Sequence, residues 1–289
     1  MAEIIYFNNR YVAPEKACLS LNDRGFQFAD GVYEVIKFYK SKPFRYNDHI
    51  TRLVRNLKEV KIEYTQTGKL EQICNELINL NGYQESYAGI YIQITRGSHQ
   101  RMHAFPVNIR PTICINSFLL PPRQDRLKNG IKVITRPDIR WLRCDIKSVS
   151  LLANVLAMQE AEETGAGECI FIRNGKVTEG THSNILAVKN GEILTHPDSE
   201  MILPGITKMT VRDICRDNKI IFNERSFSEK DLRHLDELMV TGTGNEITPV
   251  IQVNDIMIGD GNPGPVTKFI QKKFFEMTYE NLGGEKWTA

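Results

Sequence analysis

A lysine and a glutamate are the residues of this 289-residue sequence best suited to chemistry. Lys147 lies in IRWLRCDIKS, whose tryptophan, leucine and isoleucine residues supply an apolar setting. A lysine desolvated in this way loses part of its charge and can attack a carbonyl group to form a Schiff base, although most lysines are solvated. Glu179, in VTEGTHSN, ends a predicted strand at a glycine turn, where it either caps the turn or pairs with a bound group.

Two glycine-containing turns are suited to holding an anion. The segment LPGITKMT places Pro-Gly ahead of a predicted helix, so the backbone N–H groups of Ile206 and Thr207 would face an anion. The segment TGTGNE, which includes Thr243, follows a strand and could wrap an anion in the same way. Arg101 and His103, in TRGSHQRMH, either meet an anion or belong to a solvated loop.

Composition excludes several classes of protein. The 37 Lys and Arg residues balance 35 Asp and Glu residues, which argues against a nucleic-acid-binding surface. Apolar residues make up 41% and charged residues 25%, as in an ordinary globular protein. The start of the chain lacks the pattern of a signal peptide, and no apolar run is long enough to cross a membrane. Six scattered cysteines without a Cys-x-x-Cys pair indicate reduced thiols and no zinc site, so we expect a cytosolic protein.

Hydrophobic periodicity predicts an α+β protein of two domains. The segment PPRQDRLKNG, residues 121–130, interrupts every periodic pattern, so we expect it to link domains at 1–120 and 131–289. Asn-Gly pairs predict hairpins over 168–180 and 184–196. We see no βαβ rhythm. The other elements expected are helices over 48–60 with Asp48 as N-cap, 149–165, 206–218 and 265–282, and strands over 88–95, 111–120, 237–241 and 249–258.

A series of segments resembles the class IV (fold-type IV) pyridoxal-phosphate aminotransferases, and most closely their D-amino acid branch. The segments are NDRGFQFADGVYEV, YIQITRGSHQRMHAFP, IRWLRCDIKSVSLLANVLAMQEA, GKVTEGTHSNI, LPGIT and EITPV. They occur in the family's order over nearly the full length, and IRWLRCDIKS is typical of the D-amino acid branch. The resemblance implies a small N-terminal α/β domain and a larger C-terminal pseudo-barrel domain.

The resemblance also implies roles in binding pyridoxal 5'-phosphate. Lys147 would hold the cofactor as a Schiff base and later carry a proton, and Glu179 would accept a hydrogen bond from the pyridine nitrogen. The remaining cofactor-binding residues implied are Arg52, Ser183, Leu203, Ile206, Thr207 and Thr243. His182 and Gly242 stand where D-specific relatives have small hydroxyl residues, which leaves the side-chain preference and the cofactor affinity open.

For the substrate, the resemblance implies that Tyr33, Arg101 and His103 grip the α-carboxylate, the last two from the neighbouring subunit of a homodimer. The implied reaction transfers the amino group of D-alanine to 2-oxoglutarate and gives pyruvate and D-glutamate. Three alternatives stay open: an L-branched-chain aminotransferase, an aminodeoxychorismate lyase, and a non-catalytic binding protein of the same fold.

Overall fold

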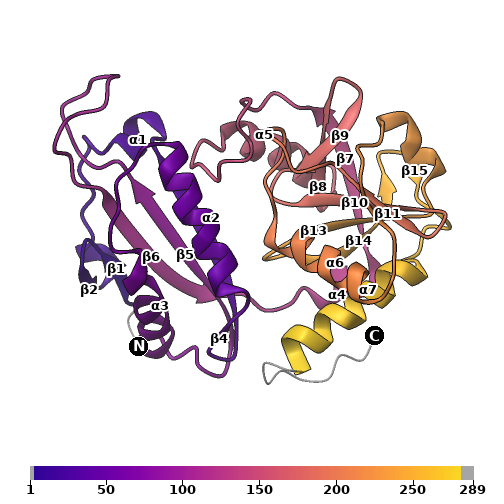
Figure 1. Ribbon diagram of the computed structural model, residues 1–289, viewed down its shortest axis with the longest axis horizontal. Helices are drawn as coiled ribbons and strands as arrows, with labels where there is room; N and C mark the ends of the chain where they lie inside the picture. The colour runs from indigo at the N-terminus through magenta and orange to yellow at the C-terminus, as the bar shows by residue number, and fades with distance from the viewer. Residues whose placement is uncertain (1–2, 281–289) are drawn as a thin grey trace. The chain divides into compact units, whose positions relative to one another are not determined.

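The computed structural model describes residues 3–280, and the chain divides into two units (Figure 1). The first unit comprises the residues up to 121 together with 146–150, and the second comprises 122–145 and the residues from 151 onwards. The boundary between the two units falls at 121/122, so all but the first residue of the segment expected as a linker, 121–130, belongs to the second unit. It forms helix α4 (Gln124–Asn129), in which Leu127 is buried and accepts a hydrogen bond from the Gln271 amide at 2.8 Å.

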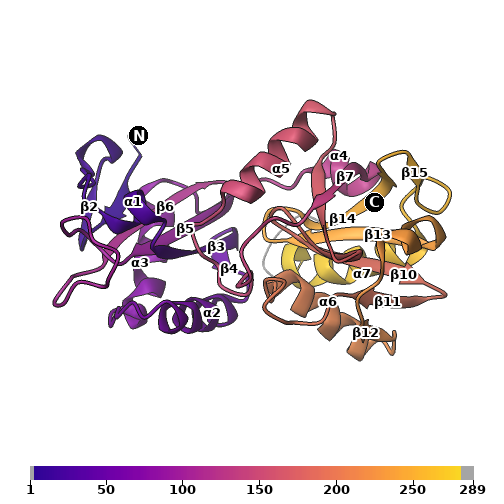
Figure 2. The ribbon, with the colours of Figure 1, turned by 90° about the horizontal axis from the view of Figure 1, so that it is seen from above.

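The first unit is a six-stranded antiparallel sheet with helices on one face. Helices α2 and α3 share one apolar core with the sheet, and Figure 2 shows both on the same side of it. Ile90, Ile92 and Ile94 alternate along one strand and face this core, as the two-residue period of a strand requires. The sheet order is β2 (Arg10–Val12), β1 (Ile5–Phe7), β6 (Thr112–Leu119), β5 (Tyr87–Thr95), β3 (Gly31–Tyr39) and β4 (Lys42–Pro43). The helices are α1 (Arg24–Phe28), α2 (Tyr46–Glu59) and α3 (Leu70–Leu80), with short 3-10 turns at Pro14–Lys16 and Thr67–Lys69.

The second unit is a nine-stranded sheet that curls into a barrel-like form, because β9 pairs with both β8 and β10. Apolar side chains from seven of its strands fill one core, whereas α5 packs on a separate cluster that includes Phe171. The strands are β7 (Ile131–Pro137), β8 (Glu168–Arg173), β9 (Lys176–Gly180), β10 (Asn184–Lys189), β11 (Glu192–Thr195), β12 (Phe222–Glu224), β13 (Glu237–Gly242), β14 (Glu246–Val253) and β15 (Ile256–Met257). The helices are α5 (Leu152–Glu163), α6 (Ile206–Asp217) and α7 (Pro265–Phe275), with a 3-10 helix at Glu229–His234 and a π-helical turn at Glu276–Glu280.

Most predicted elements are confirmed. Both Asn-Gly hairpins form, and Asn174 and Asn190 adopt the left-handed conformation that such turns need. The helices expected over 48–60, 206–218 and 265–282 agree within a few residues, although residues 281–282 lie outside the described residues.

Three expectations were wrong. Helix α2 starts two residues before Asp48, with Arg45 at the N-cap position, and the Asp48 carboxylate instead accepts a hydrogen bond from Arg45. Helix α5 starts at Leu152 rather than at 149, because 148–149 pair with β3. The sequence shows no βαβ rhythm, yet β7, α5 and β8 form a parallel crossover.

Among the described residues, every helix is too short or too polar to span a bilayer.

Candidate functional site

Lys147 is fixed to the first unit by backbone hydrogen bonds to strand β3. The Lys147 carbonyl accepts from the Tyr33 N–H at 2.9 Å, and the Val149 N–H donates to the Gly31 carbonyl at 3.1 Å. The Lys147 Nζ lies 4.4 Å from the centre of the Tyr33 ring, and no ion pair within residues 3–280 includes it. The amine is therefore held in place by backbone and ring contacts without a carboxylate that would fix its charge.

The expected apolar setting of Lys147 is only partly present. Ile146 is buried, but Trp141 is 45% exposed and Leu142 is 71% exposed. The Lys147 side chain itself is half-buried. Trp141 and Leu142 are thus largely exposed rather than packed in an apolar core.

A buried carboxylate, that of Glu34, binds Arg52 and lies close enough to Lys147 for the lysine charge to affect its pKa. Glu34 is fully buried and binds the Arg52 guanidinium through both oxygens, at 2.8 and 3.0 Å, and contacts the His49 Nδ1 at 3.0 Å. Burial alone would raise the pKa of Glu34, but the charges of Arg52, His49 and Lys147 outweigh it and lower the pKa to about 2. The pKa of His49 is also lowered, because burial disfavours its charge more than Glu34 favours it.

In the second unit, Glu179 lies on β9 and both of its oxygens have partners. One oxygen pairs with the Arg140 guanidinium in a very short contact, and the other accepts the Leu203 N–H at 2.9 Å and the Asn184 amide at 3.3 Å. Burial raises the pKa of Glu179, while Arg140 and the Leu203 N–H oppose that rise. The arrangement presents a fixed, hydrogen-bonded carboxylate within the site.

Arg140 is in turn held by a second carboxylate. Asp138 binds Arg140 at 2.8 Å and Arg173 at 2.9 Å, and it accepts the Thr178 hydroxyl at 3.1 Å. Burial would raise the pKa of Asp138, but the hydrogen bonds and charges of the two arginines lower it. Asp138 therefore stays charged and orients the arginine that contacts Glu179.

At the N-terminus of α6, the first backbone amides are arranged as expected of an anion site. Gly205 is the N-cap and supplies no side-chain cap to the amides of Ile206 and Thr207, both of which are buried. A Cβ at Gly205 would lie 1.9 Å from the Asn184 side-chain oxygen, so this position excludes larger residues. The buried hydroxyl of Thr241 has no hydrogen-bond partner within residues 3–280. These features fit a phosphate group.

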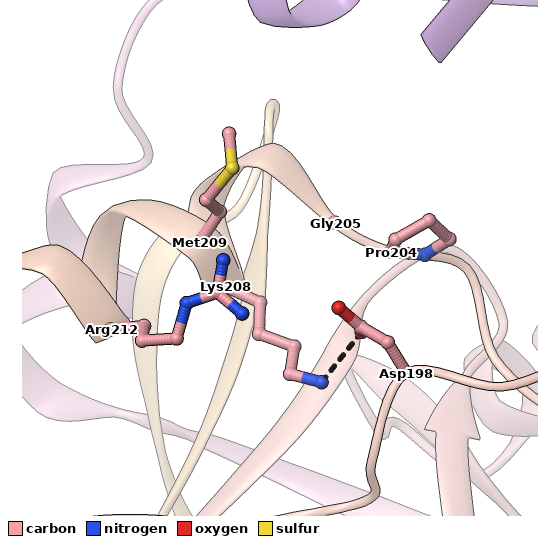
Figure 3. Close-up of a pocket in the computed structure, with 6 residues that line it drawn as sticks. All are labelled: Asp198, Pro204, Gly205, Lys208, Met209 and Arg212. Carbon is pink, nitrogen blue, oxygen red and sulfur yellow. Dashed lines mark hydrogen bonds and ion pairs between the residues drawn. The ribbon is translucent and has the colours of Figure 1, made fainter. Parts of the chain in front are cut away.

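A buried lysine fixes the loop that leads into α6. The Lys208 Nζ donates to the His196 carbonyl and to the Asp198 carboxylate, each at 2.8 Å, and lies 3.2 Å from Glu224. Figure 3 shows Lys208 reaching Asp198 across a small pocket of about 40 Å³ that Gly205 also lines. Because Lys208 is paired with these carboxylates, we interpret its contacts in this pocket as the interactions that hold the loop that carries Leu203.

The turn at 180–183 is organised by another buried carboxylate that the sequence did not reveal. Glu168 accepts hydrogen bonds from the Thr181 hydroxyl at 2.5 Å and from the Ser183 hydroxyl at 2.7 Å, and it lies 3.2 Å from the His182 Nδ1. The other ring nitrogen of His182 lies 3.3 Å from the Asn245 amide. His182 thus joins this turn to the turn at 241–246.

The two departures from the family pattern touch each other. A Cβ added at Gly242 would lie 3.2 Å from the His182 carbonyl oxygen, so a larger residue would need that carbonyl to move. The half-exposed His182 ring and the missing side chain of Gly242 are therefore two parts of one local packing arrangement.

The Arg101 and His103 side chains are exposed and lie close to one aromatic ring. The Arg101 guanidinium carbon is 4.8 Å from the centre of the Phe28 ring, and the His103 ring centre is 5.5 Å from it. On the sheet, Tyr33 stacks on Tyr91 at 5.5 Å. Arg101 and His103 are thus brought together on one loop.

Each unit gathers part of the predicted site. In the first unit, Arg52 binds Glu34 and Lys147 lies over the Tyr33 ring, close enough to Glu34 to influence its pKa; in the second, Leu203 binds Glu179. The second unit also holds Ser183, Ile206, Thr207 and Thr243 on turns and a helix start. Sequence reasoning missed the charged partners Glu34, Asp138, Arg140 and Glu168. For Asp138 and Arg140 the alternating charges in RPDIRW were an available signal.

Replacing Glu34 with Gln should change how stability depends on pH. The pKa of Glu34 is lowered from 4.5 to about 2 in the folded state. The carboxylate therefore contributes stability above pH ~4.5, on the order of 3 kcal/mol, which is lost as pH falls towards about 2. In urea unfolding at fixed protein concentration, we expect the gap between wild type and Glu34→Gln to narrow as pH falls from about 5 to about 3.

Glu71→Gln, an exposed position on α3, is the matched control and should show no such narrowing. A constant gap for Glu34→Gln over the same range would contradict the assignment of the lowered pKa.

Comparisons with known proteins identify the family of this chain. Residues 31–253 match the sequence model described as amino-transferase class IV. The D-alanine aminotransferase of Bacillus licheniformis is 39% identical over 268 residues, which cover 92% of this chain and 94% of that protein. The D-alanine aminotransferase of Staphylococcus haemolyticus is 40% identical over 272 residues, covering 93% and 96%.

Solved structures of branched-chain aminotransferases share the fold at lower identity. That of Escherichia coli superposes with a TM-score of 0.89 at 29% identity and covers 96% of this chain and 95% of that chain. That of Thermoproteus uzoniensis, with norvaline, has a TM-score of 0.86 at 26% identity and covers 98% and 96%. The family match over most of the chain, together with relatives near 40% identity, shows that this protein belongs to the class IV aminotransferases.

Proposed function

We propose that this protein is a pyridoxal-phosphate-dependent D-amino acid aminotransferase. It transfers the amino group of a D-amino acid such as D-alanine to 2-oxoglutarate and forms pyruvate and D-glutamate. The observation that carries the proposal is Lys147, whose backbone is bonded to β3 and whose amine lies over Tyr33 without a carboxylate partner in the described residues. The relatives at 39% and 40% identity, both called D-alanine aminotransferase, support the substrate class.

Two groups of residues would hold the cofactor. Lys147 would attach it covalently, and Glu179 would bind its ring nitrogen, with Ser183 and Leu203 as further contacts. Arg52 and the turn residues Ile206, Thr207 and Thr243 would bind its phosphate. When bound, pyridoxal phosphate supplies an aldehyde for the incoming amino group and a ring that accepts the electron pair left at the substrate α-carbon.

Lys147 moves the proton in this mechanism. Once displaced by the substrate amine, the free Nζ would carry the proton between the substrate α-carbon and the C4′ carbon of the cofactor. This task needs an amine held in a fixed direction. The two backbone hydrogen bonds to β3 fix the main chain and so limit the positions that the Nζ atom can reach.

Glu179 keeps a proton on the ring nitrogen. A carboxylate held by Arg140 and the Leu203 N–H cannot turn away from its partner. A negative charge at this position favours the protonated ring, because an opposite charge close by stabilises the cationic form. Asp138 preserves the arrangement by holding Arg140.

Tyr33, Arg101 and His103 would hold the substrate carboxylate and so set the hand of the substrate. With the α-hydrogen directed at Lys147 and the amino group bound, the enantiomer accepted depends on which remaining side of the site binds the carboxylate. We propose that Arg101 and His103 act from the neighbouring subunit of a homodimer.

Six free cysteines are consistent with action in the reducing cytosol.

Two other activities of the same fold remain candidates. The structurally similar branched-chain aminotransferases are less similar in sequence, at 29% and 26% identity, than the relatives called D-alanine aminotransferase. An aminodeoxychorismate lyase would release pyruvate without a keto-acid acceptor. The Arg-x-His pair at 101 and 103 favours the D-amino acid activity over both.

Steady-state turnover separates the three activities. Purified protein with pyridoxal phosphate should convert D-alanine only when 2-oxoglutarate is present, and chiral chromatography should find D-glutamate. Turnover of L-leucine in place of D-alanine would move the assignment to the branched-chain enzymes. Pyruvate release from aminodeoxychorismate without any acceptor would move it to the lyases.

Lys147→Ala should lose the visible absorption band of the covalently held cofactor and reduce turnover at least about a thousandfold, because both the attachment and the proton carrier are removed. Absorbance spectra and the D-alanine assay measure the two effects. Lys132→Ala, an exposed lysine on β7, is the control and should behave as wild type. Substantial transamination by Lys147→Ala would remove Lys147 from the mechanism.

A further inference from the structure

The loop that carries Arg101 and His103 has no helix or strand of its own. Residues 98–105 are all exposed, and the loop runs from the end of β5 to the start of β6 at Thr112. An exposed loop of this length is mobile on average unless other contacts hold it. Two charged side chains on such a loop would be poorly placed to grip a small carboxylate.

The segment before α1 binds the base of this loop. The Arg24 N–H donates to the Gly97 carbonyl at 2.9 Å, and the His99 N–H donates to the Asn22 carbonyl at 3.1 Å. Asp23, fully buried between them, accepts hydrogen bonds from the threonine hydroxyls at both ends of the loop, Thr95 at 3.1 Å and Thr112 at 2.7 Å. The two ends of the loop are thus fixed by one aspartate.

The Arg24 side chain reaches the part of the loop that carries the candidate substrate residues. It is 3% exposed, and its guanidinium donates to the Met102 carbonyl at 2.5 Å and to the His103 carbonyl at 3.3 Å. Its Nε donates to the Asp30 carboxylate at 2.8 Å. The planar guanidinium therefore links the Met102 and His103 carbonyls to the half-buried Asp30 carboxylate.

A second arginine completes the cluster. Arg96 binds both oxygens of Asp30, at 2.7 and 2.9 Å, and its guanidinium carbon lies 3.5 Å from the centre of the Phe105 ring, at the far side of the loop. Burial would raise the pKa of Asp30, but the hydrogen bonds from Arg96 and Arg24 lower it. The carboxylate stays charged and serves both arginines.

We propose that Arg24 is a positioning residue for substrate binding: it holds the 101–103 backbone so that Arg101 and His103, packed on Phe28, face the substrate carboxylate together. This inference rests on the proposed function. It extends the carboxylate-binding group to a residue that does not itself touch the substrate.

Arg24→Lys tests the proposal because lysine keeps the charge but cannot serve Asp30 and two carbonyls with one planar fork. In single-turnover reactions of the holoenzyme with D-alanine, we expect the apparent Kd to rise about tenfold, while the maximal rate changes by less than about threefold. Cofactor content should stay at the wild-type level. A matched control is Arg136→Lys, an arginine paired with Glu160 in the second unit, which should leave both constants unchanged.

A double-mutant cycle distinguishes positioning from general destabilisation. In an Arg101→Met background, which itself raises the apparent Kd, Arg24→Lys should add less than about twofold because the group it positions is absent. Equal effects in both backgrounds, or a loss of cofactor content in Arg24→Lys alone, would overturn the proposal. Phe28→Leu removes the ring that contacts both the Arg24 and the Arg101 guanidinium groups, and it should raise the apparent Kd about threefold, again only when Arg101 is present.

Amide hydrogen exchange separates this inference from the proposed function. Arg24→Lys should accelerate exchange within residues 97–105 and leave α2 and α3 unchanged. Unchanged exchange in the loop would overturn the inference even if D-alanine is a substrate. If the wild-type protein gives no reaction with D-alanine, the proposed function fails, and faster loop exchange in Arg24→Lys would still show that Arg24 holds the loop.

Discussion

The cost of burying charge is the constraint on which the site depends. An unpaired buried charge costs several kcal/mol, and two buried carboxylates of the candidate site are each matched by an arginine. Glu34 binds Arg52 in the first unit, and Glu179 binds Arg140 in the second. Compared with apolar residues of similar volume, such pairs add little net stability, but their fixed geometry gives the functional groups one direction. Lys147 is the contrast, because no carboxylate of the described residues pairs with its amine.

This division of roles has a chemical purpose. Groups that must remain charged, such as the carboxylate proposed for the ring nitrogen, are supported by arginines whose charge does not change near neutral pH. Lys147, the group proposed to gain and lose a proton, has its backbone hydrogen-bonded to β3 and its amine over an aromatic ring instead. In the loop with Arg101, the buried Arg24, paired with the half-buried Asp30, holds the backbone, while the Arg101 guanidinium is exposed.

Local signals made much of the fold predictable. The Asn-Gly turns and the apolar periodicity of α6 lie within a few residues of the elements they specify, so the sequence located them well. The helix within 121–130 was not predicted, because Leu127 is buried and accepts a hydrogen bond from a residue more than a hundred positions away, which no local pattern reports. The pairing of 146–150 with β3 also depends on a long-range contact.

For the site too, some residues could be named from the sequence and others only from the structure. The resemblance named the residues expected to touch cofactor and substrate, and their types suit those tasks. It did not reveal what orients them: Glu34, Glu168 and Arg140 are ordinary charged residues in sequence, and their roles arise only from burial and from partners distant in the chain. Motifs therefore located the chemistry, whereas the structure identified the residues that position it.

The most direct test is the half-reaction of the purified holoenzyme, followed by absorbance with no keto acid present. The account predicts that D-alanine converts the visible band of the pyridoxal form to that of the pyridoxamine form, while L-leucine leaves it unchanged. Conversion by L-leucine and not by D-alanine would contradict the assignment of substrate hand to Tyr33, Arg101 and His103.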